Sequence, residues 1–423
     1  MNMLGIRWQA MRGALAVPDL RRLNSAYLCG QLAGMAYLVA IGVYAFNHGG
    51  ASQVGLMTVV RYAPALLAAP FAGAIADRFA RRHLLIGVGL CRAIAHSAAA
   101  ILVMGGAPPM TVYLAIAASG LASAAFEPAK AALLPTLART PEQLTAANAL
   151  GASIENVALT VGPALGGLLL AIASVQVVLF AFAAASLLSA FLIWRIEREP
   201  RRAVAAPEPG GGLRRTLAGF ETIARTQALR TVVGLFALQM LLFGLLNVFV
   251  ITIALNQLHT GAGGVGWLYL AGGIGGILGG AITANLAAEG LTRSLTIGML
   301  TISGAFLLLA ALPNEPIALI AMFLISFGGC YVDVATFTSL QNSIDDAILA
   351  RAFSVIGTII IGALLLGGAI APVLISLIGT TAALSLPGCV ALVGTAFAIP
   401  TLRRIDAPAP DLLSPLAPLP SPA

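Results

Sequence analysis

Charge is what this sequence has least of. Only 9% of its 423 residues are Asp, Glu, Lys or Arg, whereas soluble domains carry about 25%. At the same time 59% of the residues are hydrophobic, and the mean hydropathy is +0.96. So few charges cannot cover a surface that faces water. The composition therefore excludes a soluble globular protein and indicates that lipid surrounds most of the chain.

Several chemical signatures are also missing. The four cysteines lie far apart in apolar stretches and lack the C-x-x-C spacing of a metal site, so we expect free thiols, no metal and no cofactor. The sequence has no Walker motif and no nucleophile constellation, which argues against an ATP-driven protein and against an enzyme. The net charge of +7 does not imply nucleic acid as a partner, because the arginines follow a membrane topology instead.

Long apolar stretches make up most of the chain. A bilayer core about 30 Å thick needs about 20 apolar residues per helix. The first stretch is too long for the core of a signal peptide, so we expect it to be retained. The pattern predicts an all-α membrane protein with twelve transmembrane helices, near 23–46, 52–76, 83–105, 110–136, 144–172, 175–195, 229–256, 263–287, 293–312, 316–342, 347–377 and 380–401.

The basic residues set the orientation of these spans. Of the 23 Lys and Arg residues, all but Arg61, Arg92 and Lys130 fall at the N-terminus, in the even-numbered loops or at the C-terminal end. The positive-inside rule then places both termini in the cytoplasm. Lys130 is the sole lysine, and Ala, Gly and Arg are abundant, which indicates a GC-rich bacterial genome. We therefore expect a multi-pass protein of the bacterial inner membrane.

A polar interruption divides the chain. Residues 196–228 form a Pro- and Gly-rich linker with a basic amphipathic stretch, and they separate six-helix bundles at 23–195 and 229–402. Residues 1–22 form a cytoplasmic N-terminus, and the Pro-rich residues 403–423 are expected to be a disordered tail. Adding 206 to a residue number places Glu127 on Asp333, Gly151 on Gly357 and Gly162 on Gly368. Parallel repeats of this kind place a substrate site at their interface near the membrane midplane.

The loop between the second and third spans carries a recognisable pattern. It resembles the G-x-x-x-D-R/K-x-G-x-R/K-R/K motif of the major facilitator superfamily, although Ala80 replaces the second glycine. With twelve spans in two halves, this resemblance implies the major facilitator fold, in which two pseudo-symmetric six-helix bundles rock around a central cavity. The residues that carry the motif in this loop of the first half are Gly73, Asp77, Arg78, Arg81 and Arg82. The equivalent loop of the second half matches the motif poorly.

These loop residues have two interpretations. By the family resemblance, Asp77 meets the N-terminus of the eleventh span, whose helix dipole attracts negative charge, and forms a latch that holds the cytoplasmic side closed. Alternatively, the arginines only satisfy the positive-inside rule. That alternative accounts for Arg81 and Arg82 but not for the acid, so we favour the latch.

A second pattern lies in the fifth span, at Gly162, Pro163, Gly166 and Gly167. It is similar to the core of the motif that marks antiporters within the superfamily, but the earlier glycines of that motif are absent. The stretch 126–135 and the basic stretch before the seventh span resemble the branch that holds enterobactin exporters and macrolide-efflux pumps. The resemblance implies proton-driven export of a small amphipathic molecule by alternating access, without specifying which molecule.

Charged residues inside the spans are rare and must pair, line water or function. By the resemblance, Glu127 and Asp333 face each other across the cavity, and one of them, preferably Asp333, carries the coupled proton. A carboxylate in such a cavity can load and release a proton near neutral pH. For Glu127, the favoured alternative is an ion pair with Lys130, one turn away, or with Arg92. Asp333 has no basic neighbour in its own span.

Other polar residues in the spans have two possible roles as well. Glu155 is a candidate ion-pair partner for Arg61, and His96 shares a helix face with Arg92. Substrate-contact candidates lie on the cavity helices, although polar groups also join helices to one another. These candidates are Asn24, Gln31, Gln239, Asn247 and Tyr331.

Two rival functions remain open. An importer or facilitator on the same fold would differ from an exporter in the direction of substrate flux. A membrane sensor or scaffold that transports nothing would need no coupling acid, and the paired acids argue against it. The fold resemblance further implies a monomer whose partners are the lipid bilayer, protons and a small-molecule substrate.

Overall fold

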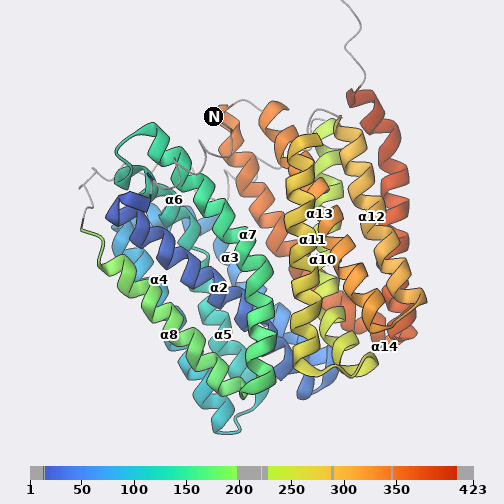
Figure 1. Cartoon of the computed structure of the whole chain (residues 1–423), viewed down its shortest axis with the longest axis horizontal. Helices are drawn as coiled ribbons and strands as arrows, with labels where there is room; N and C mark the ends of the chain where they lie inside the picture. The colour runs from blue at the N-terminus through green and yellow to red at the C-terminus, as the bar shows by residue number, and fades with distance from the viewer. Residues whose placement is uncertain are drawn as a thin grey trace, which may run out of the picture.

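The computed structural model describes the backbone of residues 13, 15–197, 221, 227–286, 290–343 and 346–406. It describes the side chains of these residues except 69–78, 156, 284–286, 291, 341–343, 346–354 and 405–406. The described part is helical almost throughout (Figure 1). An all-α membrane fold is therefore confirmed.

The described part of the N-terminal half contains seven helices. Most of them begin or end at glycine or proline, because these residues do not continue a regular helix. Thr140 caps its helix by accepting a hydrogen bond from the backbone N–H of Gln143. The helices are α2 (Pro18–Asn47), α3 (Gly50–Arg78), α4 (Arg81–Met104), α5 (Pro109–Ser123), α6 (Phe126–Leu137), α7 (Pro141–Ile172) and α8 (Val175–Trp194).

The C-terminal half begins after the linker, most of which lies outside the described residues. Its described elements are α10 (Gln227–Thr252), the π-helical segment η1 (Ile253–Gln257), α11 (Gly261–Leu286), α12 (Leu291–Ala311), α13 (Glu315–Ser343) and α14 (Asp346–Asp406). The last of these contains a turn at Gly379, whose φ of 77° and ψ of 164° are not helical. Only glycine adopts such angles without strain, so α14 contains two helical arms rather than one rod.

The predicted spans coincide with these helices. Ten stretches of the described chain are long and apolar enough to cross a membrane, and the last, Val355–Arg404, includes the turn at Gly379 and so covers two predicted spans. Helix α3 covers the predicted span 52–76. The predicted span 110–136 is divided into α5 and α6. Pro128 lacks an N–H to bond the carbonyl of Ala124, which accounts for the break there.

The two halves repeat the same packing. In the first half α2 packs on α7, α4 on α8 and α5, and α3 on α5. In the second half α10 packs on α14, α12 on α14 and α13, and α11 on α13. Taking the two arms of α14 as the eleventh and twelfth spans, each pair of the first half has its counterpart in the second. This correspondence agrees with the repeat offset of 206 residues.

The halves meet mainly through two helix pairs, α7 with α11 and α3 with α14, and less extensively where α10 contacts α2 and α3. At the first contact a Cβ placed on Gly167 would lie 2.5 Å from the Cα of Gly266, so the backbones approach as closely as glycine allows. At the second, Gly55 and Thr58 contact Pro372 and Gly368. In Figure 1 the bundles meet toward the lower edge of the view, and their helices diverge toward the upper edge, where α14 ends.

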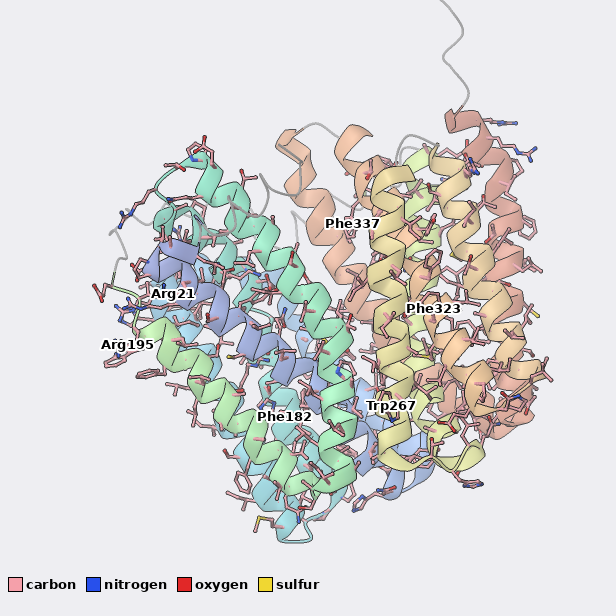
Figure 2. All side chains as sticks on the ribbon, in the orientation of Figure 1. Arg21, Phe182, Arg195, Trp267, Phe323 and Phe337 are labelled. Atoms are coloured by element: carbon pink, nitrogen blue, oxygen red, sulfur yellow. The ribbon has the colours of Figure 1, made fainter. Side chains whose placement is uncertain are left out.

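The outer surface is apolar, as a lipid-facing surface must be. Phe397 is 82% exposed, and Leu67, Ile172 and Leu377 are each more than 70% exposed. Basic residues gather instead at helix ends. Figure 2 shows Arg21 and Arg195 at one end of the N-terminal bundle, where α2 begins and α8 ends. Apolar sides with charged ends define a multi-pass membrane protein.

Candidate functional site

The intramembrane charges fall into three groups. Glu127, Lys130 and Glu155 lie together on α6 and α7, Asp333 lies alone on α13, and Arg61 with Arg92 lies on α3 and α4. Each group has a different electrostatic composition.

Glu127 forms the ion pair that its position predicts. Its Oε2 lies 2.7 Å from Nζ of Lys130, three residues further along α6. The same ammonium lies over the ring of Tyr27, 3.3 Å from the ring centroid, and the Tyr27 hydroxyl accepts a hydrogen bond of 2.8 Å from Gln31. The charge of Glu127 is therefore balanced locally. Pairing with Lys130 rather than Arg92 is the arrangement that the structure shows.

Glu155 does not pair with Arg61. Its charged neighbours are Glu127 and Lys130, which lie across from α7 on α6. Arg61 lies instead against the rings of Tyr37 and Tyr62. The prediction of an Arg61–Glu155 pair was wrong because membership of the same bundle does not determine which helix faces meet.

Asp333 has a polar partner but no basic one. Its Oδ1 accepts a hydrogen bond of 3.1 Å from Nε2 of Gln239 on α10, and the same nitrogen donates to the carbonyl of Gly329 at 3.1 Å. Gln239 is fully buried. Among the described side chains, no ion pair includes Asp333. The repeat offset places Lys130 on Thr336, so the second half has a hydroxyl where the first half has the cation that neutralises its acid.

A cavity of about 230 Å³ lies beside the two remaining arginines. The guanidinium carbon of Arg61 lies 5.1 Å from the ring centroid of Tyr37 and 4.9 Å from that of Tyr62. Arg92 donates a hydrogen bond of 2.9 Å to the carbonyl of Gly30. The cavity is lined by Gly34, Tyr37, Arg61, Tyr62, Ala65, Arg92, Ser119, Gly120, Ser123, Ala124 and Ile361.

His96 and its neighbours complete this region. His96 is fully buried, its ring lies 4.9 Å from that of Tyr37, and its Nε2 lies 3.3 Å from the hydroxyl of Ser119. Sequence reasoning identified both arginines and His96 but missed Tyr37 and Tyr62. The available signal was the scarcity of aromatic residues, 6% of the chain, together with Tyr62 directly following an intramembrane arginine.

The predicted substrate contacts lie in different surroundings. Asn24 and Asn247 each donate to a carbonyl four residues earlier in their own helix, at 2.9 and 3.0 Å. Asn247 also accepts a hydrogen bond of 2.9 Å from the hydroxyl of Tyr269 on α11. Gln31 and Gln239 bind Tyr27 and Asp333, respectively. Tyr331 is buried, with its ring 5.3 Å from that of Phe327.

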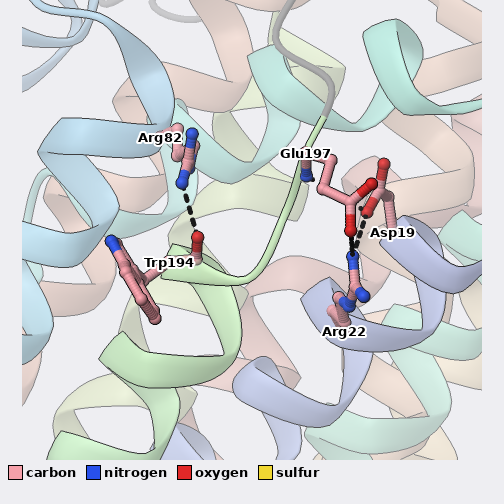
Figure 3. A network of polar contacts seen from close by, with 5 residues as sticks. All are labelled: Asp19, Arg22, Arg82, Trp194 and Glu197. Carbon is pink, nitrogen blue, oxygen red and sulfur yellow. Dashed lines mark hydrogen bonds and ion pairs between the residues drawn. The ribbon is translucent and has the colours of Figure 1, made fainter.

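The loop motif is described only in part. Gly73, Asp77 and Arg78 lie outside the described side chains, so the latch remains a prediction. Arg81 donates a hydrogen bond of 3.0 Å to the carbonyl of Ala132 on α6, and Arg82 donates to the carbonyl of Trp194 at the end of α8. The two arginines therefore join the start of α4 to neighbouring helices of its own bundle, and Figure 3 shows the contact of Arg82 with Trp194.

A second set of polar contacts lies at the same end of the bundle. Nη1 of Arg22 lies 2.9 Å from Oδ1 of Asp19 and 3.4 Å from Oε1 of Glu197 (Figure 3). The backbone N–H of Glu197 also donates to Oδ1 of Asp19 at 3.4 Å. This network ties the chain that leaves α8 to the start of α2.

The Gly-Pro pattern of α7 lies on two packing contacts. Gly162 faces Met35, and Gly166 faces the carbonyl of Ala36, both on α2, whereas Gly167 faces Gly266 on α11. Pro163 lies within α7. This segment therefore joins the core of the N-terminal bundle to the contact between the halves.

Two packed six-helix bundles with ionisable residues inside the membrane define a membrane transporter. The sequence model of the Major Facilitator Superfamily matches residues 23–359, and the chain belongs to that family. An uncharacterized MFS-type transporter of Mycobacterium tuberculosis is 23% identical over 367 residues, which cover 82% of each chain.

Solved structures support the same fold. A peptide transporter POT in complex with sulfate matches with a TM-score of 0.74 and 13% identity over 92% of this chain and 95% of its own. The nucleoside transporter NupG matches with a TM-score of 0.71 and 15% identity over 90% of this chain and 99% of its own. At such identities the likeness concerns the fold.

Proposed function

We propose that this transporter is a proton-coupled exporter of a small amphipathic molecule. It works as a monomer in a bacterial inner membrane, with both termini in the cytoplasm. The single observation that carries the coupling is the isolation of Asp333. Its carboxylate lies within a membrane-spanning helix and has Gln239 as its hydrogen-bond partner.

An acid in that position suits proton coupling for an electrostatic reason. An unpaired carboxylate at membrane depth is unfavourable, and binding a proton removes its charge. Glu127 lacks this property because Lys130 already balances it. We therefore assign the coupled proton to Asp333 and a structural role to Glu127. The amide of Gln239 can bind both the ionised and the protonated carboxyl group of Asp333, since its N–H donates to a carboxylate and its carbonyl accepts from a carboxylic acid.

The helix contacts support alternating access. In this conformation the halves touch through Gly167 and Gly266 and through Gly55 and Pro372. Both contacts lie near the ends of the helices that are remote from the termini. Rocking the bundles about this region would expose the cavity to the two sides of the membrane in turn.

The Gly-Pro pattern at 162–167 supports export. It resembles the antiporter motif, and its glycines lie at the contact that must change when the bundles rock. The resemblance to enterobactin exporters and macrolide-efflux pumps agrees with this direction. An importer or facilitator on the same fold is the rival that the experiment must exclude.

The test uses inside-out vesicles whose interior is acidic. In these vesicles the cytoplasmic side of the transporter faces the external medium. A pH-sensitive dye inside the vesicles reports proton efflux on addition of ethidium, erythromycin or phenyl phosphate. An exporter accumulates at least one of these probes while protons leave. Probe movement that is equal with and without the pH gradient would identify a facilitator and overturn the coupling. Accumulation only in right-side-out vesicles would overturn the direction.

A further inference from the structure

Two arginines of the N-terminal bundle line one cavity, and none of the described residues that line it is acidic. Arg61 of α3 and Arg92 of α4 both line the space of about 230 Å³. The ion pairs of the described side chains join Arg22 to its two acids and Lys130 to Glu127, so neither cavity arginine takes part in one. Cations inside a membrane protein are normally paired or line a pathway. The charge of this cavity is therefore positive and unbalanced.

The hydrogen-bond donors of the cavity are also in excess. Within the part of the chain that the structure describes, Nη1 of Arg61, Nε of Arg92 and the hydroxyl of Tyr37 are buried and have no hydrogen-bond partner. The rings of Tyr37 and Tyr62 attract the guanidinium charge of Arg61, but ring faces accept its N–H groups only weakly. Buried donors are normally satisfied, so several unsatisfied ones at one site call for an explanation.

We infer that this cavity binds the oxyanion head group of the transported molecule, a carboxylate or a phosphate. The planar guanidinium of arginine presents its donors in a fork that matches both oxyanions. The hydroxyls at the cavity wall are already engaged, because Ser123 donates to the carbonyl of Ser119 at 2.7 Å and Ser119 lies 3.3 Å from Nε2 of His96. The donors available to an anion are therefore those of Arg61, Arg92 and Tyr37. The inference rests on the proposed transport function and narrows its substrate class from amphipathic molecules to organic anions.

The size of the cavity limits what it holds. A volume of about 230 Å³ lies below the range of about 300–1,000 Å³ typical of pockets for drug-sized ligands. The cavity therefore takes a charged head group and a few further atoms. The apolar part of the substrate must extend from it along the apolar residues that form the rest of the wall, such as Ala65 and Ile361.

The cavity is formed by both halves of the protein. Ile361 belongs to α14, and Tyr269 of α11 is an electrostatic neighbour of Arg61. Tyr269 in turn binds Asn247 of α10. An anion held by Arg61 and Arg92 would therefore also touch the opposite bundle. Binding would favour the conformation in which the halves are close here, as alternating access requires.

The test compares ligands that differ in charge but little in shape. Purified full-length protein in detergent is heated at constant ionic strength with benzoate, phenyl phosphate, benzamide or benzylamine, each up to about 10 mM. This is roughly ten times the dissociation constant of about 1 mM for a weakly bound fragment. We expect benzoate or phenyl phosphate to raise the melting temperature, and we expect neutral benzamide and cationic benzylamine to leave it unchanged. The two anions distinguish a carboxylate site from a phosphate site.

Three variants locate the effect. Arg61→Gln and Arg92→Gln should weaken the apparent anion affinity by at least about tenfold. Arg21→Gln is the matched control, because Arg21 is exposed at the end of the bundle. Equal effects of benzoate and benzamide, no effect of either anion on the wild type, or anion stabilisation that survives in both cavity variants would each overturn the inference.

The ligand-free variants provide a second measurement. Removing an unpaired buried charge should leave the melting temperature unchanged or raise it, as is common where function conflicts with stability. A marked drop, or failure of Arg61→Gln to fold, would show that Arg61 is structural. Phospholipid that copurifies with the wild type and is lost from Arg61→Gln would assign the site to a lipid head group and also overturn the inference.

This result is separable from the proposed coupling, because binding is measured without a pH gradient. A protein that binds benzoate through Arg61 yet moves no protons would overturn the coupling alone. Proton-driven transport restricted to neutral or cationic probes would overturn the anion site alone.

Discussion

Gln239 on α10 and Asp333 on α13 are joined by a hydrogen bond of 3.1 Å, in which the amide donates to the carboxylate. Glu127, at the equivalent position of the first half, has a charged partner instead, because it is paired with the ammonium of Lys130. The two repeats thus have an acid at equivalent positions, but among the described side chains only the first acid has a cation beside it. This asymmetry separates an acid whose charge is balanced from one whose partner is a neutral amide.

Replacing Asp333 with Asn should abolish transport driven by a pH gradient. Asparagine preserves the acceptor for Gln239, so the helices should pack as before, but it cannot exchange a proton. Probe accumulation in inside-out vesicles should fall by at least about tenfold, the scale of a lost proton-transfer group. Glu127→Gln is the matched control and should retain accumulation. If both variants keep the full gradient-driven rate, neither acid couples transport to protons.

Gly167→Ala should impair transport although it adds a single methyl group. The new Cβ would lie 2.5 Å from the Cα of Gly266, so α7 and α11 could no longer meet. Overpacking of this kind destabilises a contact by about 1–3 kcal/mol. Melting temperature and probe transport check the result.

Gly151→Ala, also in α7, is the control, because nothing lies within 4 Å of its added Cβ. It should stabilise the helix by about 0.5–1 kcal/mol. Equal behaviour of the two variants would contradict the proposed role of this contact.

Lys130→Met should lower stability only slightly. The change removes the ion pair with Glu127, whose side chain is 55% exposed, and the contact with the ring of Tyr27. Exposed ion pairs contribute about 0–1 kcal/mol and cation–π contacts about 0.5–2 kcal/mol. We expect a loss of about 1–2 kcal/mol in thermal or denaturant unfolding. The double variant Lys130→Met with Glu127→Gln should recover the part of the lost free energy of unfolding that comes from leaving Glu127 without its cation. A loss that is unchanged in the double variant would assign the effect to the tyrosine contact alone.

Both ends of the chain should be accessible from the cytoplasm. The arginines that follow the positive-inside rule lie where α2 begins, where α8 ends and at the end of α14, at Arg403 and Arg404. Epitope tags at the two ends should therefore be cleaved by protease in inside-out vesicles and protected in intact spheroplasts. Tags on opposite sides would require an odd number of spans and contradict the twelve-helix arrangement.

Much of the fold could be read from the sequence. The spans follow from local hydropathy, since a helix enters the bilayer according to its own composition. The repeat was visible because Glu127 and Asp333 fall on one another at a constant offset. The division of one predicted span into α5 and α6 was not foreseen, although Pro128 provided the signal. The turn within α14 was foreseen, because Gly379 lies between the predicted spans 347–377 and 380–401.

The site was predictable in its parts but not in its connections. The sequence marked Arg61, Glu155, Gln239 and Asp333 as unusual, because polar residues are costly in hydrocarbon. It assigned Arg61 to Glu155 and treated Gln239 as a substrate contact. The structure shows Arg61 against Tyr37 and Gln239 against Asp333. Each of these contacts joins two helices, and a change in the rotation of either helix would separate the partners.

The sequence by itself determined that this chain lies in a membrane as two repeated six-helix bundles, because partition between water and lipid is a property of each segment alone. Only the tertiary structure decided which rare charges are balanced and which are not. Lys130 is balanced by Glu127 and contacts Tyr27, whereas Arg61 and Arg92 line a cavity whose described residues include no acid. That difference depends on the faces that packed helices turn toward one another, and no segment carries this information on its own.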